Sequence, residues 1–285
     1  MIYQFYIAGL RFQLNISWPI TLSANFLPFM EKPSEHWDEH ITLTCLEEFP
    51  AVPQPTEWIG GAGETLLDGK KCVLHRLSEI SEPYLMELYH SGHDRTFAYL
   101  KRSNELPLSM AKVFNNISME ELFRRHDIFI LHSAFIRWQG RAILFSAHSG
   151  VGKSTQADLW ARYQNAEILN GDRSALRRVD GVWTAFGLPF AGSSDIFRSE
   201  SAPVACIVML AQGPENVIST LNPAQAFRRV LQEVTLHYWD PAFMTWGMDR
   251  VEALLGDVPV FGLSCLPDRG AVDLLHETIT REVLS

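Results

Sequence analysis

A short run near the middle of the chain has the residue types and spacing of a phosphate-binding loop. Residues 143–155 read ILFSAHSGVGKST, so an apolar stretch passes through small residues into a lysine. Glycines let backbone N–H groups surround an anion, and the helix expected to begin at Lys153 adds the partial positive charge of its N-terminus. The strand, loop and helix context is the one this motif requires. The run therefore predicts a nucleotide site.

Each position of the loop has an expected role. Lys153 would reach the outer phosphates, and the Ser154 hydroxyl would ligate Mg²⁺. Ala147 stands where the pattern G-x-x-x-x-G-K-[ST] has its first glycine, and Lys153 is the only lysine after Lys112. The residues expected at the nucleotide are Ala147, His148, Ser149, Gly150, Val151, Gly152, Lys153, Ser154 and Thr155.

An acid after the next apolar stretch is the second candidate. Residues 166–171 read AEILNG and lead into Asp172. Phosphate-loop proteins commonly hold their metal with an acid at the end of a strand. We expect Asp172 to support Mg²⁺ together with Ser154; the alternative is an acid in an ordinary turn.

The elements that must position these residues divide the chain into three parts. Residues 1–112 are predicted to form a β-rich N-terminal domain, with two strands around Ala8-Gly9 and a tight hairpin at Asp68-Gly69. Residues 113–126 are predicted to form a connecting helix. Ser118 and Glu121 have the spacing of a capping box at its start.

From Asp127 onward, apolar strands alternate with helices, which is typical of an α/β domain. Separate strands are expected at 128–131 and 134–138, and a further strand at 142–145 runs into the glycine loop. Domain 127–285 should therefore carry the site.

Composition narrows the classes of function. The chain has 285 residues, 47% of them hydrophobic, and a net charge of −9, which argues against nucleic acid or an anionic membrane as a partner. Its four cysteines are far apart in the sequence and are expected to be reduced. We find no pattern of a signal peptide or membrane span, so the cytoplasm is the expected location. Homo-oligomerisation stays open.

The residues from Asp127 to Ser285 resemble the HPr-kinase-like P-loop kinases, which are related more distantly to ATP-dependent phosphoenolpyruvate carboxykinase. In that family a histidine begins a strand, a hairpin follows, and a loop G-x-S-G-x-G-K-S comes next. His132 and residues 147–154 match this spacing, with Ala147 as a departure. The family has paired aspartates where this chain has Gly171-Asp172.

Two later segments are similar to relatives found outside sugar-uptake regulation, some of which phosphorylate a serine hydroxyl of a lasso-peptide precursor. These segments are Gly187 to Gly192 and Ser201-Ala202-Pro203. The resemblance implies a P-loop kinase core that uses ATP and Mg²⁺ to phosphorylate a serine-type hydroxyl on a peptide or protein.

The resemblance also implies roles for individual side chains. Lys153, Asp172 and His132 would be catalytic, and Arg173 and Arg198 are candidate charge stabilisers. Either Asp172 or His132 would accept the hydroxyl proton. Two other classes of function stay open: a non-catalytic nucleotide-binding module, and a kinase of a small metabolite.

Overall fold

A computed structural model describes residues 1–59, 61–78, 81–90, 95–101, 109–190 and 192–283. The chain is mixed α/β with two large sheets, and it divides into two compact units. Unit 1 comprises Met1–Arg125 and His237–Met244, and unit 2 comprises His126–Leu236 and Thr245–Ser285. Residue 191, inside one of the segments used for the resemblance, lies outside the described residues.

Unit 1 contains an eight-stranded sheet of order β3-β1-β2-β4-β8-β7-β6-β5. Its elements are β1 (Ile2–Ile7), β2 (Leu10–Ile16), the 3-10 helix η1 (Ala24–Phe29), β3 (Met30–Glu31), β4 (Glu39–Leu46), β5 (Ala62–Leu67), β6 (Lys70–His75), β7 (Leu85–Tyr89), β8 (Arg95–Lys101), α1 (Met110–Asn116) and α2 (Met119–Arg124). The two predicted strands around Ala8-Gly9 and the predicted hairpin at Asp68-Gly69 are confirmed. Ala8-Gly9 joins β1 to β2 and Asp68-Gly69 joins β5 to β6, and all four turn residues have positive φ, as two-residue hairpin turns of this kind require.

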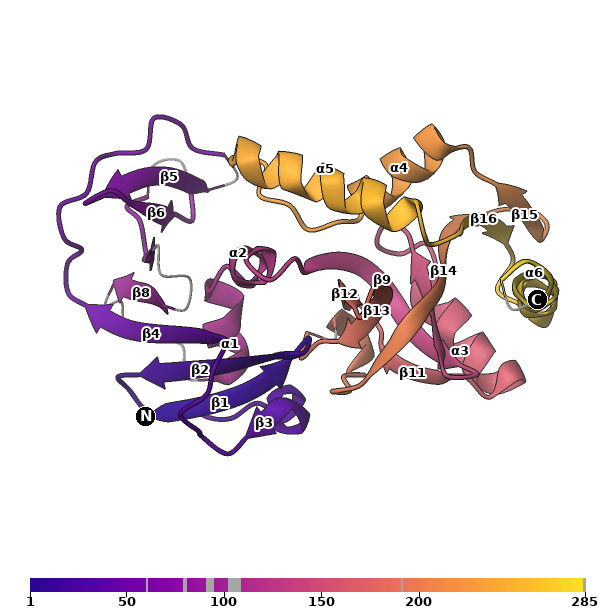
Figure 1. The fold of residues 1–285 in the computed structure, drawn as a ribbon, viewed down its shortest axis with the longest axis horizontal. Coiled ribbons are helices and arrows are strands. Elements are labelled where there is room, and N and C mark those ends of the chain that lie inside the picture. Colours follow the sequence, from indigo (N-terminus) through magenta and orange to yellow (C-terminus); the bar gives the residue numbers. More distant parts are fainter. Residues whose placement is uncertain (60, 79–80, 91–94, 102–108, 191, 284–285) are drawn as a thin grey trace. The chain divides into compact units, whose positions relative to one another are not determined.

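Unit 2 contains a second large sheet, in which the order β10-β9-β12-β13-β14-β16-β15 is completed by pairing of β10 with β14 and of β11 with β9. Its elements are β9 (Phe129–Trp138), β10 (Arg141–Ser146), α3 (Lys153–Gln164), β11 (Glu167–Asn170), β12 (Arg173–Val179), β13 (Val182–Gly187), the 3-10 helix η2 (Gly192–Ser194), β14 (Ser201–Gln212), β15 (Val217–Thr220), α4 (Pro223–Gln232), β16 (Val260–Cys265) and α6 (Arg269–Glu282). The helix α5 (Pro241–Leu255) begins in unit 1 and belongs to unit 2 from Thr245 onward. The long strands β9 and β14 can be followed through this unit in Figure 1.

One hydrophobic core positions the glycine loop. β10, β14 and β16 run parallel, and side chains of α3 and α6 pack with theirs. Trp160 of α3 and Leu275 of α6 are fully buried beside Phe145 of β10 and Val208 of β14. Because a parallel sheet presents the ends of its strands together at one edge, the loop after β10 is held on a packed framework.

The predicted strands 128–131 and 134–138 are one continuous strand, β9, so the prediction of two strands, the second beginning after His132, is wrong. The polar pair His132-Ser133 suggested a break. Ser133 is fully buried, but its hydroxyl lies 2.8 Å from the hydroxyl of Ser174 on β12. Burying a hydroxyl that has a hydrogen-bond partner costs little free energy. The strand therefore continues, and His132 lies in its interior.

The predicted connecting helix at residues 113–126 is not one helix: residues 113–116 end α1, and α2 covers Met119–Arg124. The predicted capping box at the start of α2 does not form. The Ser118 side chain makes no cap hydrogen bond. Its hydroxyl donates instead to Glu87 Oε2 of β7 at 2.5 Å, and its backbone N–H donates to Glu87 Oε1 at 2.9 Å. Glu121, the other expected partner, forms an ion pair with Arg124 at 2.7 Å. Ser118 therefore binds a buried carboxylate of the sheet and does not cap α2.

The sequence interpretation missed α5. Its start carries a recognisable signal, since Asp240 accepts hydrogen bonds from the N–H groups of Ala242 and Phe243 at 2.9 and 3.0 Å and Pro241 occupies the first helical position. Asn222 and Asp268 cap α4 and α6 in the same way. All four cysteines are free thiols. Among the described residues, no helix is both long and apolar enough to cross a membrane.

Candidate functional site

The glycine loop, residues 147–152, joins β10 to α3, and α3 begins at Lys153 as predicted. Gly150 and Gly152 have φ of 81° and 124°, values that side chains rarely adopt. Gly152 is the N-cap of α3, no side chain caps that end, and the first turn holds no acidic residue. The first-turn N–H groups therefore have no side-chain acceptor, which favours an anion there.

Ala147 is compatible with this loop for a clear reason. It does not appear among the residues with positive φ, so a side chain causes no backbone strain there. Its methyl group is 4% exposed and packs in the core with Phe145 and Ala157. Ala147 thus adds a core contact at a position where the backbone does not need the conformational freedom of glycine.

Lys153 turns back over the loop. Its Nζ donates to the carbonyl oxygens of Ala147 at 2.7 Å and His148 at 3.4 Å. Burial lowers the pKa of its ammonium group, while the negative charges of Glu233 and Asp172 oppose that shift. The amine is therefore enclosed by the loop and close to two carboxylates.

Asp172 and His132 lie together next to the loop. His132 Nε2 is 3.4 Å from Asp172 Oδ1, and the hydrogen bond from His132 lowers the pKa of the carboxyl, against the effect of burial and assisted by Arg173 and Lys153. Asp172 is consequently ionised at neutral pH. Three predicted residues, Lys153, Asp172 and His132, are close together, although they come from three separate segments.

The turn that carries Asp172 is organised by Asn170. Its Oδ1 accepts from the N–H groups of Asp172 and Arg173 at 2.9 and 3.0 Å, and its Nδ2 donates to the carbonyls of Leu188 and Phe190 at 2.8 and 3.0 Å. Asn170 is fully buried, and all four of these bonds fix the turn. Sequence reasoning passed over it because a single asparagine gives no pattern.

A side chain at Gly171 would force Ser194 to move. A Cβ there would lie 2.1 Å from Ser194 Oγ and 2.5 Å from Ser194 Cβ, closer than real contacts allow. The space of a second acid is thus taken by Ser194, and Asp172 is the acid that this turn offers.

Glu233 is the site residue that sequence reasoning missed. It directly follows α4, its side chain is 4% exposed, and its two oxygens lie 3.1 Å from His132 Nδ1 and 2.8 Å from His148 Nδ1. Its backbone carbonyl accepts from the N–H of His132 at 2.8 Å. Nothing local in the sequence links it to the loop, because the pairing depends on where α4 ends.

The remaining predicted residues are distributed unevenly. Arg173 Nε lies 3.3 Å from Asp172 Oδ2, so it borders the site. Arg198 lies instead beside Glu200, at 3.9 Å. Ser149, Ser154 and Thr155 are exposed, and Val151 packs partly against the core. Gln212, at the end of β14, adds hydrogen bonds of 3.4 Å to the carbonyls of Gly150 and Val151.

The residues present fit a nucleotide better than a preformed metal centre. The uncapped helix start, the two positive-φ glycines and the buried amine suit phosphate oxygens. In the part of the chain that the structure describes, no group of three or more His, Cys, Asp or Glu side chains is arranged to hold a metal. Ser154 and Asp172 would suit Mg²⁺, which keeps several waters and takes ligands from substrate phosphates.

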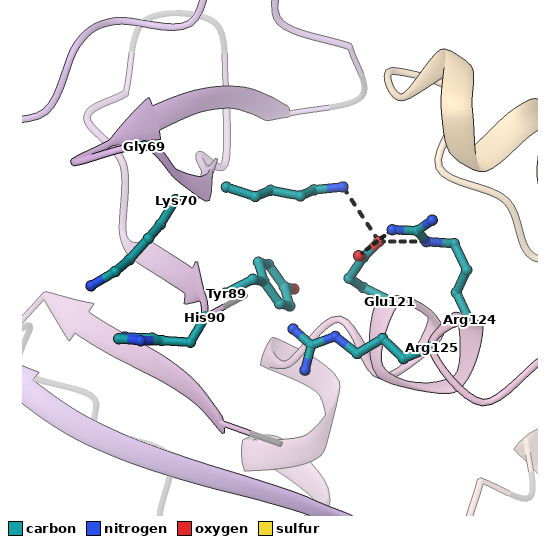
Figure 2. Close-up of a pocket in the computed structure, with 8 residues that line it drawn as sticks. Gly69, Lys70, Tyr89, His90, Glu121, Arg124 and Arg125 are labelled. Atoms are coloured by element: carbon teal, nitrogen blue, oxygen red, sulfur yellow. Dashed lines mark hydrogen bonds and ion pairs between the residues drawn. The ribbon is translucent and has the colours of Figure 1, made fainter. Parts of the chain in front are cut away.

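A cavity of about 440 Å³ lies within unit 1 (Figure 2) and is lined by Gly69, Lys70, Lys71, Tyr89, His90, Glu121, Arg124 and Arg125. Most of its cations are already paired. Lys71 Nζ lies 2.6 Å from Asp240 and 3.4 Å from Glu121, and Arg124 also binds Glu121. Arg125 binds Glu39 at 3.0 Å. This ion-pair network leaves little uncompensated charge for a ligand.

Comparisons with known proteins give limited information. No protein-family model matches the chain, and no curated protein matches it. Among solved structures, the HPr(Ser) kinase/phosphatase from Coxiella burnetii is similar, with 14% sequence identity, coverage of 53% of this chain and 88% of that chain, and a TM-score of 0.30. A similarity of this size carries no argument about activity, which must rest on the site.

Proposed function

We propose that this chain is an ATP- and Mg²⁺-dependent kinase that phosphorylates a serine-type hydroxyl carried by a peptide or protein. The observation that carries the proposal is the glycine loop, with the buried Lys153 amine at its centre and the His132–Asp172 pair beside it. The choice of a hydroxyl in a peptide rests on the sequence resemblance.

Positively and negatively charged side chains have different roles in the proposed reaction. Lys153 and the first N–H groups of α3 would hold phosphate oxygens, and Ser154 with Asp172 would hold the metal. MgATP supplies the phosphoryl group, and Mg²⁺ offsets charge on its oxygens. His132 already donates to Asp172, so the carboxylate is the group with lone pairs for the acceptor hydroxyl. Asp172 would thus orient that hydroxyl and accept its proton, as acids do in other kinases.

The test compares native protein with Lys153→Ala in γ-labelled ATP and Mg²⁺, with label traced by mass spectrometry into peptides, proteins and free serine. Losing one charged hydrogen bond costs about 1.5–3 kcal/mol, so MgATP should bind about 10- to 150-fold more weakly and transfer should fall at least in proportion. Arg162→Ala is the matched control, because Arg162 is an exposed cation in the last turn of the same helix.

The outcomes separate the alternatives. Equal label transfer by native protein and Lys153→Ala would contradict the proposal. Tight MgATP binding without transfer to any acceptor would favour a non-catalytic nucleotide-binding module, a function consistent with the single acid left beside Gly171. Transfer to free serine and not to peptides would favour a metabolite kinase.

A further inference from the structure

Glu233 connects two histidines from different segments through one carboxylate. His132 belongs to β9 and His148 to the glycine loop, and each presents its Nδ1 to a different oxygen of Glu233, at 3.1 and 2.8 Å. The Glu233 side chain is 4% exposed, whereas that of His148 is 74% exposed. The carboxylate is therefore a fixed buried point, and the loop histidine is the group that it restrains.

The chemistry of a carboxylate determines what each ring must do. An ionised carboxylate only accepts hydrogen bonds, so both histidines must carry a proton on Nδ1. Nε2 of each ring is then the atom left for other partners: that of His132 lies 3.4 Å from Asp172, and that of His148 projects from an exposed side chain on the loop. A carboxylate that binds one ring nitrogen keeps that nitrogen protonated and sets how the ring is turned.

We propose that Glu233 is a positioning residue that keeps Nδ1 of both His132 and His148 protonated and fixes the orientation of both rings, and thereby holds the glycine loop against β9. Its effect on phosphoryl transfer rests on the proposed function, but its effect on the two rings does not. Because it acts through the histidines, Glu233 itself needs no contact with nucleotide or acceptor.

The first experiment needs no activity. Glu233→Gln keeps the shape of the side chain, but its amide accepts at one atom and donates at the other. One of the two histidines must then lose its Nδ1 proton or give up its hydrogen bond to the amide. Nitrogen-15 NMR of the imidazoles, assigned with His132→Gln and His148→Gln variants, should find both Nδ1 atoms protonated in the native chain and only one in Glu233→Gln. An unprotonated Nδ1 in the native chain, or unchanged rings in the variant, would overturn the proposal.

The second experiment measures turnover. Glu233→Gln should lower kcat about 10- to 100-fold, the range for carboxylates that orient a functional histidine, with a smaller change in KM for MgATP. Glu252→Gln, an exposed site on α5 that loses the same charge, should leave both unchanged. An unchanged kcat in Glu233→Gln would overturn the catalytic consequence. If the native chain transfers no phosphoryl group, the proposed function fails, while the NMR result still decides the role of Glu233.

Discussion

At the scale of single residues, the site is a series of polar contacts in which each group limits the next. Glu233 binds His132, His132 donates to Asp172, and Asp172 lies within electrostatic reach of Lys153. Burial opposes the ionisation of Asp172, but the hydrogen bond from His132 and the charges of Arg173 and Lys153 outweigh it. The ionisation of Asp172 is therefore a property of the group and should respond to changes in its neighbours.

We expect His132→Ala to raise the pKa of Asp172 towards its ordinary value of 3.8, because the hydrogen bond from His132 is the largest cause that lowers it. Carbon-13 NMR of the Asp172 carboxyl during an acid titration measures this directly. A carboxyl whose pKa is lowered by folding adds stability above the pKa of the unfolded chain and loses it as pH falls through the folded value. Native protein should therefore lose this contribution below about pH 4, and an unchanged Asp172 midpoint in His132→Ala would contradict the assignment.

At the scale of elements, α2 shows a local signal overruled by a tertiary contact. Burial opposes ionisation of Glu87, but the hydrogen bond and charge of His75, together with two hydrogen bonds from Ser118, outweigh burial and lower its pKa. Glu87 is fully buried, so it needs those partners more than the helix start needs a cap. The Ser118 hydroxyl accordingly points into the unit and away from the N–H groups of α2.

A double-mutant cycle tests this account of α2. Ser118→Ala should cost about 1–3 kcal/mol of unfolding free energy, because it removes a partner from a buried carboxylate. Its coupling with Glu87→Gln should be about 0.5–3 kcal/mol, the range for residues in contact. The matched cycle of Ser118→Ala with Glu121→Gln should show smaller coupling. Stronger coupling to Glu121 than to Glu87 in urea unfolding would restore the capping-box interpretation.

At the scale of the whole molecule, the chain passes through most of unit 2 and then contributes one further segment to unit 1. The segment His237–Met244 belongs to unit 1, where Phe243 is 1% exposed, stacks on His237 and lies under the Arg124 guanidinium. α5 thus begins in unit 1, and its later residues belong to unit 2. Unit 1 is therefore built from two separate stretches of the sequence.

Two substitutions on the same helix should therefore destabilise different units. Phe243→Ala should lower the free energy of unfolding by about 3–5 kcal/mol and Leu254→Ala by about 2–5 kcal/mol, because both side chains are buried. Hydrogen exchange should become faster in unit 1 for Phe243→Ala and in unit 2 for Leu254→Ala. Faster exchange of the same peptides in both variants would argue against this division of the chain.

Much of the local structure could be predicted from the sequence because its causes are local. Asp-Gly and Ala-Gly turns, Pro223 after Asn222, and the start of α3 at Lys153 depend on the conformational preferences of adjacent residues. The same is true of the glycine loop, where Gly150 and Gly152 take up positive φ. The residue types expected to bind phosphate were therefore recognisable from sequence alone.

Only the tertiary structure decided which distant groups meet that loop. Glu233 reaches His132 and His148 because α4 ends beside β9, Ser194 occupies the space beside Gly171, and β9 continues through His132 because Ser174 provides a partner for Ser133. Such contacts depend on the register and packing of segments far apart in the chain, which no local spacing encodes. The sequence determined the conformation of the glycine loop and the start of the helix that follows it, and the packing of the sheet determined which polar groups surround the loop.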